Sequence, residues 1–228
     1  MKSSKILKSL LIFGSYFIYT YLIVILLSVT FALFGVKLSD ASDLIKYWIL
    51  MGTDLLYIIF LIAVYRKELK EKFKDFRKNF SKYMDTGIKY WIIGLIIMVA
   101  SNKLISVFTP SQMAQNEQSV RELFDTFPIY TLVATSLFAP FVEELIFRKS
   151  IKDIINTKWI YILFSGFIFG SIHVVSSLSG YYDFFYIIPY GALGASLAYM
   201  YYKTDNIFVS MMMHAIHNTI LVSLLFFM

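Results

Sequence analysis

The stretch SLLIFGSYFIYTYLIVILLSVTFALFGV, residues 9–36, contains no charged residue. An α-helix rises about 1.5 Å per residue, so roughly 20 apolar residues are enough to cross the hydrocarbon core of a bilayer. The run is also far longer than the roughly 7 to 15 apolar residues at the centre of a secretory signal peptide. We therefore expect a retained transmembrane helix, and with it an integral membrane protein of the all-α class.

The composition of the rest of the chain agrees with this expectation. Of 228 residues, 58% are hydrophobic and 16% are charged, and the mean hydropathy is +0.68. Cysteine is absent, which excludes disulfides, thiolate metal sites and a cysteine nucleophile. We expect one polytopic domain, residues 1–228, built as a bundle of about seven transmembrane helices. The predicted spans are 10–34, 47–65, 90–108, 127–147, 159–178, 184–202 and 207–227.

The basic residues predict how this bundle sits in a cell membrane. With the N-terminus inside, 17 of the 21 Lys and Arg residues lie on inner segments, and the outer ones are Lys37, Lys46, Lys103 and Arg121. Because cytoplasmic loops carry an excess of basic residues, we expect a cytoplasmic N-terminus and an outer C-terminus. The net charge of +6 then reflects topology and contact with the lipid bilayer, with no nucleic acid as partner.

One short segment outside the spans predicts a further helix. The sequence NEQSVRELFDTFP, residues 116–128, places Ser119 and Glu122 at the spacing of a capping box, with apolar residues at helical spacing after them. We expect a short amphipathic helix on the outer surface.

Two neighbouring carboxylates and an arginine interrupt the fourth span. A charge at the centre of a bilayer costs roughly 2.5 to 3.5 kcal/mol on insertion scales, so Glu143, Glu144 and Arg148 must pair or face a polar cavity. Glu144 and Arg148 are four residues apart and share a helix face, whereas Glu143 points about 100° away. We expect an internal Glu144 to Arg148 ion pair. Pro140 cannot donate to Ser136, so that carbonyl also needs a polar partner.

All three histidines of the chain also lie in predicted spans. His173 is in the fifth span, and His214 and Asn218 share one face of the seventh because they are four residues apart. We interpret His217 as a packing residue, and Asp54 in the second span as a structural hydrogen-bonding residue. Small residues four apart predict close contact between the fifth and sixth spans. They are Gly166 with Gly170, Gly191 with Ala195, and Gly194 with Ala198.

Three motifs, which follow one another along the chain in the fourth, fifth and seventh predicted spans, together resemble one known family. Glu-Glu-x-x-x-Arg, Phe-x-x-x-His and His-x-x-x-Asn occur at Glu143, Glu144 and Arg148, at Phe169 and His173, and at His214 and Asn218. This order is similar to the signature of the CPBP (CAAX protease and bacteriocin-processing, or Abi) intramembrane proteases. The resemblance covers a catalytic core of about residues 125–225.

The resemblance implies glutamate-dependent hydrolysis of a peptide bond in a membrane-associated peptide or protein. The expected catalytic residues are Glu143 as general base, His173 as the partner that holds the water, and His214 with Asn218 as donors to the tetrahedral oxyanion. Glu144 and Arg148 would orient the site. For the spans to place these residues at one depth, the fourth helix must continue inward past Arg148. We therefore expect a site in the inner half of the membrane, open to the cytoplasm.

Three alternatives remain open at the level of sequence. Zinc held by Glu143, His173 and His214 is possible, but the chain lacks His-Glu-x-x-His, so we expect no cofactor. A non-catalytic protein of the same fold would act in bacteriocin immunity or bind and regulate a membrane partner. A proton- or ion-coupled transporter would also carry buried Glu, His and Arg. The cysteine-free composition, rich in Lys, Ile and Phe, looks bacterial.

Overall fold

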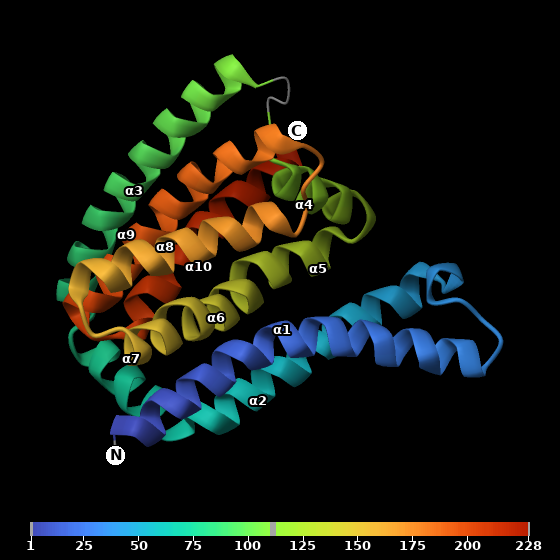
Figure 1. The fold of residues 1–228 in the computed structure, drawn as a ribbon, viewed down its shortest axis with the longest axis horizontal. Helices are drawn as coiled ribbons and strands as arrows, with labels where there is room; N and C mark the ends of the chain where they lie inside the picture. Colours follow the sequence, from blue (N-terminus) through green and yellow to red (C-terminus); the bar gives the residue numbers. More distant parts are fainter. Residues whose placement is uncertain (1, 110–112, 228) are drawn as a thin grey trace.

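The computed structural model describes residues 2–109 and 113–227, and all regular secondary structure in these residues is helical, which confirms the all-α class. Figure 1 shows the arrangement of the helices. They are α1 (Lys2–Leu33), α2 (Asp43–Lys78), α3 (Phe80–Phe108), α4 (Gln115–Thr126), α5 (Pro128–Val133), α6 (Ala139–Glu144), α7 (Ile151–Ile154), α8 (Lys158–Val175), α9 (Ile187–Thr204) and α10 (Ile207–Leu224). Five short 3-10 or π segments accompany them: η1 (Leu38–Asp40), η2 (Ala134–Phe138), η3 (Leu145–Ser150), η4 (Tyr181–Tyr186) and η5 (Leu225–Phe227).

Six helical segments among the described residues are long and apolar enough to cross a membrane. They are Ser3–Leu33, Asp43–Lys78, Phe80–Phe108, Pro128–Ile154, Lys158–Val175 and Ile207–Phe227. Each overlaps one predicted span. The remaining predicted span, 184–202, forms α9, which does not meet the same measure of hydropathy. Helix α9 carries many small and aromatic residues because it lies inside the bundle, between α8 and α3.

The predicted amphipathic helix exists, but it begins earlier than its sequence signal indicated. Helix α4 starts at Gln115, and Ala114 occupies its N-cap position. Ser119 therefore lies inside the helix, where its hydroxyl donates to the carbonyl of Gln115 at 3.1 Å. The capping-box interpretation of Ser119 was wrong because a serine one turn into a helix can satisfy its hydroxyl on the preceding turn.

The helices form two groups, and the helical run from α5 to α7 lies between them (Figure 1). Helices α1 and α2 make an antiparallel hairpin on one side, and α3, α8, α9 and α10 pack together on the other. The run from α5 to α7 lies between them, with η3 and α7 against α1, and η2 and α6 against α10. Both groups therefore cover the helical run that carries Glu143, Glu144 and Arg148.

Helices α8 and α9 approach each other backbone to backbone, as the small residues predicted. A Cβ atom placed on Gly170 would lie 2.5 Å from the carbonyl oxygen of Ile187, and one on Gly166 would lie 2.7 Å from that of Gly191. These distances leave no room for any side chain, so glycine is required at both positions. The close approach fixes the position of His173, three residues beyond Gly170, relative to α9.

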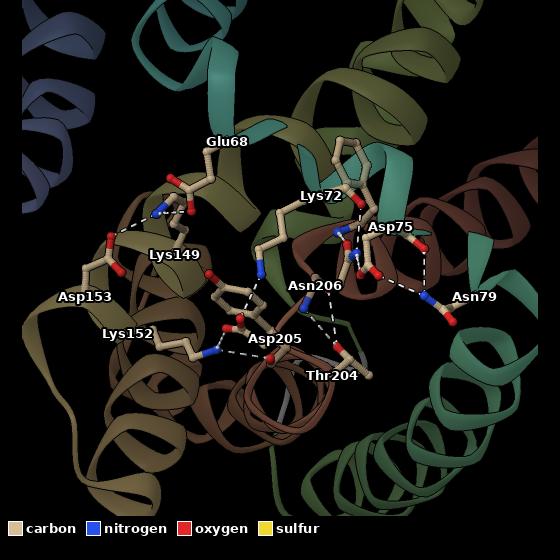
Figure 2. Close-up of polar contacts among 12 residues, drawn as sticks. Glu68, Lys72, Asp75, Asn79, Lys149, Lys152, Asp153, Thr204, Asp205 and Asn206 are labelled. Atoms are coloured by element: carbon tan, nitrogen blue, oxygen red, sulfur yellow. Dashed lines mark hydrogen bonds and ion pairs between the residues drawn. The ribbon is translucent and has the colours of Figure 1, made fainter. Parts of the chain in front are cut away.

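Ion pairs fasten the helix ends on the side of the N-terminus (Figure 2). Asp205, in the turn between α9 and α10, pairs with Lys72 of α2 and Lys152 of α7 at 2.7 Å each. Three further pairs lie close by: Lys5 with Asp153 at 2.8 Å, Lys149 with Glu68 at 2.8 Å, and Lys149 with Asp153 at 2.9 Å. Because α1, α2, α7 and the α9 to α10 turn all meet here, we call this the N-terminal end of the bundle. The C-terminus lies toward the opposite end (Figure 1).

Candidate active site

Two π segments flank the paired glutamates within the continuous helix from Pro128 to Ile154. The segment η2 precedes α6, and η3 follows it directly after Glu144. Single π turns inside α-helices are frequent at functional sites, since each extra residue rotates the side chains beyond it. The local helix geometry therefore aims Glu143 and Glu144 differently from what a regular helix would do.

Pro140 follows the first π segment and leaves one carbonyl of that segment without a backbone donor. The N–H of Ala139 donates to the carbonyl of Ala134, five residues back, so Pro140 occupies the position that would serve Thr135. Proline has no N–H, and the Thr135 carbonyl instead accepts a hydrogen bond from Nδ2 of Asn218 at 2.8 Å. The sequence analysis named the carbonyl of Ser136, four residues before Pro140; the carbonyl that Asn218 reaches is that of Thr135, five residues before it, in the register of the π turn.

Glu144 is enclosed together with its predicted partner. Oε1 of Glu144 lies 3.4 Å from Nε of Arg148, and both side chains are 0% exposed. The same oxygen accepts a hydrogen bond from Nδ1 of His214 at 3.0 Å. The guanidinium carbon of Arg148 lies 4.1 Å from the centre of the Phe169 ring. The sequence indicated the Glu144 to Arg148 pair but not that His214 joins it.

Glu143 faces both motif histidines. Its Oε2 lies 3.7 Å from Nε2 of His214 and 4.0 Å from Nε2 of His173, and the side chain is 15% exposed. This oxygen is buried and makes no hydrogen bond to any described residue. The structure thus gathers five of the six predicted site residues into one group: Glu143, Glu144, Arg148, His173 and His214.

Two aromatic rings and a backbone carbonyl hold the His173 imidazole. Its Nδ1 lies 2.9 Å from the carbonyl oxygen of Phe169, and the two ring centres are 4.3 Å apart. Tyr190 of α9 stacks on the same imidazole at 5.0 Å with an interplanar angle of 25°. The sequence analysis missed Tyr190, because a tyrosine among apolar residues carries no motif that distinguishes it from a packing residue.

The remaining predicted residues lie around this group. Within the described part of the chain, no hydrogen bond links Asn218 to the glutamates or the histidines; its amide holds Thr135 instead. His217 is buried, at 4% exposure. Asp54 accepts a hydrogen bond from the hydroxyl of Tyr130 at 2.7 Å, which joins α2 to α5.

The helices bring the site to the middle of the bundle. As predicted, the fourth span continues past Arg148, to Ile154, and Arg148 is fully buried. Measured from the helix ends at the N-terminal end of the bundle, Glu143, His173 and His214 lie 11, 15 and 7 residues along their helices, or roughly 16, 22 and 10 Å at about 1.5 Å per residue. The three side chains face one another although they lie at unequal distances along their helices. The expectation of a site in the inner half of the membrane stays a prediction.

The donor set does not closely fit a tetrahedral metal. With bonds of about 2.0 to 2.1 Å, ligand atoms around zinc are about 3.3 Å apart, against 3.7 and 4.0 Å from the Glu143 oxygen to the two histidine nitrogens. Nor do residues 2–109 and 113–227 contain three or more His, Asp or Glu side chains grouped to hold a metal ion.

Comparison with known families gives an independent view of this segment. Residues 125–220 match the model of the family described as "Type II CAAX prenyl endopeptidase Rce1-like". This segment therefore resembles the Rce1-like family, and we call it the Rce1-like segment. The resemblance inferred from the three motifs is therefore confirmed, and the Rce1-like segment lies within the predicted core of residues 125–225 and contains all six predicted site residues.

The matches to curated relatives cover more of the chain than the Rce1-like segment does. The chain is 25% identical over 173 residues to "Putative membrane peptidase YdiL" of Bacillus subtilis, covering 72% of this chain and 66% of the relative. It is 26% identical over 174 residues to "UPF0177 protein YvdC" of Lactococcus lactis, covering 74% of this chain and 64% of the relative. The chain thus spans a little less than two thirds of these two relatives. No solved structure matches.

Proposed function

We propose that the protein is an intramembrane endopeptidase that hydrolyses a peptide bond in a membrane-associated peptide or protein. The observation that supports this most is the position of the Glu143 carboxylate, which faces Nε2 of both His173 and His214 within 4.0 Å. A general base must reach the proton that it abstracts directly or through one water, and this group meets that condition. The Rce1-like segment and the name of the Bacillus relative agree with a protease.

The attacking water binds between Glu143 and His173. Two polar atoms 4.0 Å apart are too far for a direct hydrogen bond, but an oxygen about 2.8 Å from each bridges them. If Nδ1–H of His173 donates to the Phe169 carbonyl, Nε2 is left as an acceptor that orients this water. Glu143 then takes one proton, the hydroxide attacks the carbonyl carbon, and Glu143 later returns the proton to the leaving amine as the C–N bond breaks.

His214 stabilises the oxyanion as an imidazolium. The site contains two carboxylates and one guanidinium, so a proton on His214 makes the charge of this buried group neutral. Glu144 accepts from Nδ1–H, and Nε2–H is left to donate to the developing negative oxygen. Removing one such donor costs roughly 3 to 4 kcal/mol of transition-state stabilisation in a soluble protease. Asn218 contributes its second amide hydrogen or only positions η2.

We further propose that no metal is needed and that the N-terminus is cytoplasmic. The polar separations at Glu143 suit a bridging water better than zinc ligands. The basic residues favour the N-terminal end of the bundle as the inner end. The substrate is then a peptide or protein that reaches mid-membrane depth.

The test compares membrane fractions of bacteria that express the wild type, Glu143→Gln or Asp54→Asn, by peptidomics. We expect one or more peptides that require Glu143, and we expect Asp54→Asn to resemble the wild type because this matched intramembrane carboxylate lies outside the motifs. A synthetic copy of such a peptide should be cleaved by the purified protein, and a metal chelator should not inhibit cleavage. Inhibition that zinc reverses would refute the metal-free mechanism.

Two other results would replace the proposal. A biological phenotype that persists in Glu143→Gln, with no Glu143-dependent peptide, would indicate a non-catalytic binding protein. Proton or ion flux into reconstituted vesicles without peptide cleavage would indicate a transporter.

A further inference from the structure

His173 occupies a position in α8 that leaves its ring in need of support. It lies two residues before the last residue of the helix, Val175, and the chain beyond Val175 leaves the helical path before η4. Beyond this point the carbonyls of Ile172, His173 and Val174 accept hydrogen bonds from Ser176 and Ser177 and not from a further turn of helix. An imidazole that must keep Nε2 toward Glu143 therefore needs contacts from other elements.

Tyr190 supplies such a contact from the neighbouring helix. Its ring lies nearly parallel to the imidazole, at 25° and 5.0 Å, one residue before Gly191. Gly191 forms part of the backbone contact with Gly166, so the Tyr190 backbone is fixed relative to α8. The stacking is consequently set by the backbone-to-backbone contact of α8 with α9.

The outer face of Tyr190 is held in turn by other elements. The ring packs against a buried cluster of Ile105, Ala114, Val174 and Tyr186. Its hydroxyl accepts a long hydrogen bond, 3.5 Å, from Nδ2 of Asn116 at the start of α4. Asn116 and His173 also line the same shallow hollow. Helix α4 thus reaches the histidine through Tyr190.

We propose that Tyr190 is a positioning residue for His173: its ring keeps the imidazole oriented toward Glu143, and α4 supports it through Asn116. This inference deepens the proposed function and rests on it for its catalytic consequence. The orientation itself is a structural property, so it can be measured without a substrate. It also gives a role in the site to the amphipathic helix α4, all of which precedes the first motif residue, Glu143, in the chain.

The first test uses the fact that the chain has only three histidines. Protein labelled with ¹⁵N-histidine is reconstituted in lipid nanodiscs, and the ring-nitrogen signals are assigned by replacing one histidine at a time. We expect Tyr190→Leu to shift or broaden the His173 signals and to leave those of His217 unchanged. Tyr190→Phe keeps the stacked ring and should preserve the His173 signals. Asn116→Ala should produce a smaller change than Tyr190→Leu.

A matched control separates ring stacking from general loss of packing. Tyr199 also lies on α9, but its ring packs on Tyr90 at 4.6 Å rather than on a histidine. Tyr199→Leu should leave the His173 signals unchanged. Unaltered His173 signals in Tyr190→Leu would overturn the inference whether or not the protein is a protease.

The second readout is the turnover of the peptide that the comparison of wild type with Glu143→Gln identifies. Tyr190→Leu should lower kcat about tenfold or more with KM changed less than about twofold, and Tyr190→Phe should restore it, because a misdirected group affects the reaction more than binding. A Glu143-independent cleavage would contradict the proposed function but not the NMR result. Loss of activity in Glu143→Gln with normal kcat in Tyr190→Leu would contradict the inference alone.

Discussion

The Arg148 side chain has no exposed surface, and its charge is balanced within the protein. Glu144 lies 3.4 Å from its Nε, and the Phe169 ring covers the guanidinium at 4.1 Å. Attraction between ions is strong in such surroundings, but so is the cost of removing them from water. The pair therefore specifies one arrangement of the site. Removing one of the two residues destabilises the protein because the other then remains buried without its partner.

We predict that Arg148→Ala lowers the free energy of unfolding by about 3 to 5 kcal/mol, because two carboxylates then remain without their guanidinium. Chemical unfolding in detergent would measure this change. Arg66→Ala, at an exposed position of α2, should change the same quantity by less than about 0.5 kcal/mol. The double variant Arg148→Ala, Glu144→Gln should cost less than the sum of its single variants. Strict additivity would mean that the two side chains do not interact.

The residue pattern identified much of this site before the structure did. The spacing of Glu144 and Arg148 predicted their pairing because i and i+4 residues share a helix face. The contact of His214 with Glu144 and the stacking of Tyr190 on His173 could not be predicted, since they depend on how separate helices cross. The start of α4 was also misjudged, because Ser119 suits either an N-cap or a first helical turn.

At the scale of helices, Pro140 and Asn218 act as a pair. The proline removes an N–H from the helix and the asparagine satisfies the carbonyl of Thr135 from α10, at 2.8 Å. A π turn that would otherwise leave a polar group unsatisfied in an apolar setting is thereby compatible with the membrane. The sequence indicated that Pro140 would free a carbonyl but could not show which side chain would reach it.

We predict that Asn218→Ala destabilises the protein by about 1 to 3 kcal/mol in the presence of Pro140, because the Thr135 carbonyl loses its partner. In a Pro140→Ala background the restored N–H can serve that carbonyl, so the same substitution should cost clearly less. A double-mutant cycle of unfolding free energies measures the difference. Equal costs in both backgrounds would show that Asn218 does not act through the π turn.

A second prediction concerns the contact of α8 with α9. Gly170→Ala places a methyl group 2.5 Å from the Ile187 carbonyl oxygen, so the helices must separate, at a cost of about 1 to 3 kcal/mol. Gly14→Ala on α1 is the matched control, since nothing lies within 4 Å of its added Cβ. Thermal unfolding in detergent should show a lower Tm for Gly170→Ala only. Similar Tm values for both variants would contradict the close packing.

At the scale of the whole molecule, charge pairs at one end join the α1 to α2 hairpin to the motif-bearing helices. Asp205 is central to them, because it contacts cations from both α2 and α7 (Figure 2). Its backbone is left-handed, with φ of 48°, a conformation that asparagine and aspartate adopt more readily than most residues. Asp205→Asn therefore removes the charge while preserving the turn.

This substitution should have a pH-dependent effect. Burial alone would raise the pKa of Asp205, but the ammonium groups of Lys152 and Lys72 hold this pKa below its ordinary value. A lowered folded-state pKa means that the carboxylate contributes stability above its unfolded pKa of about 4 and loses it as pH falls through the folded value. We predict that Asp205→Asn lowers the unfolding free energy by roughly 0.2 to 1 kcal/mol at pH 7, since the side chain is 71% exposed.

The difference between wild type and Asp205→Asn should shrink as pH falls below about 4, when both side chains are uncharged. Unfolding measured at pH 3 to 7 in a nonionic detergent tests this dependence. Asp85→Asn, an exposed carboxylate of α3, serves as the control with little effect at any pH. A constant difference for Asp205→Asn across the range would show that its charge is not responsible.

The contact between α8 and α9 also determines where this chain tolerates changes in length. One residue inserted between Gly170 and His173 would rotate the imidazole by about 100° and move it about 1.5 Å along the helix. One residue inserted between Tyr190 and Gly191 would separate the stacking ring from the glycine that fixes it. The segment between Val175 and Tyr181 connects α8 to η4 and lies outside both helices. Insertions and deletions should therefore be accepted in that connection and rejected within either helix.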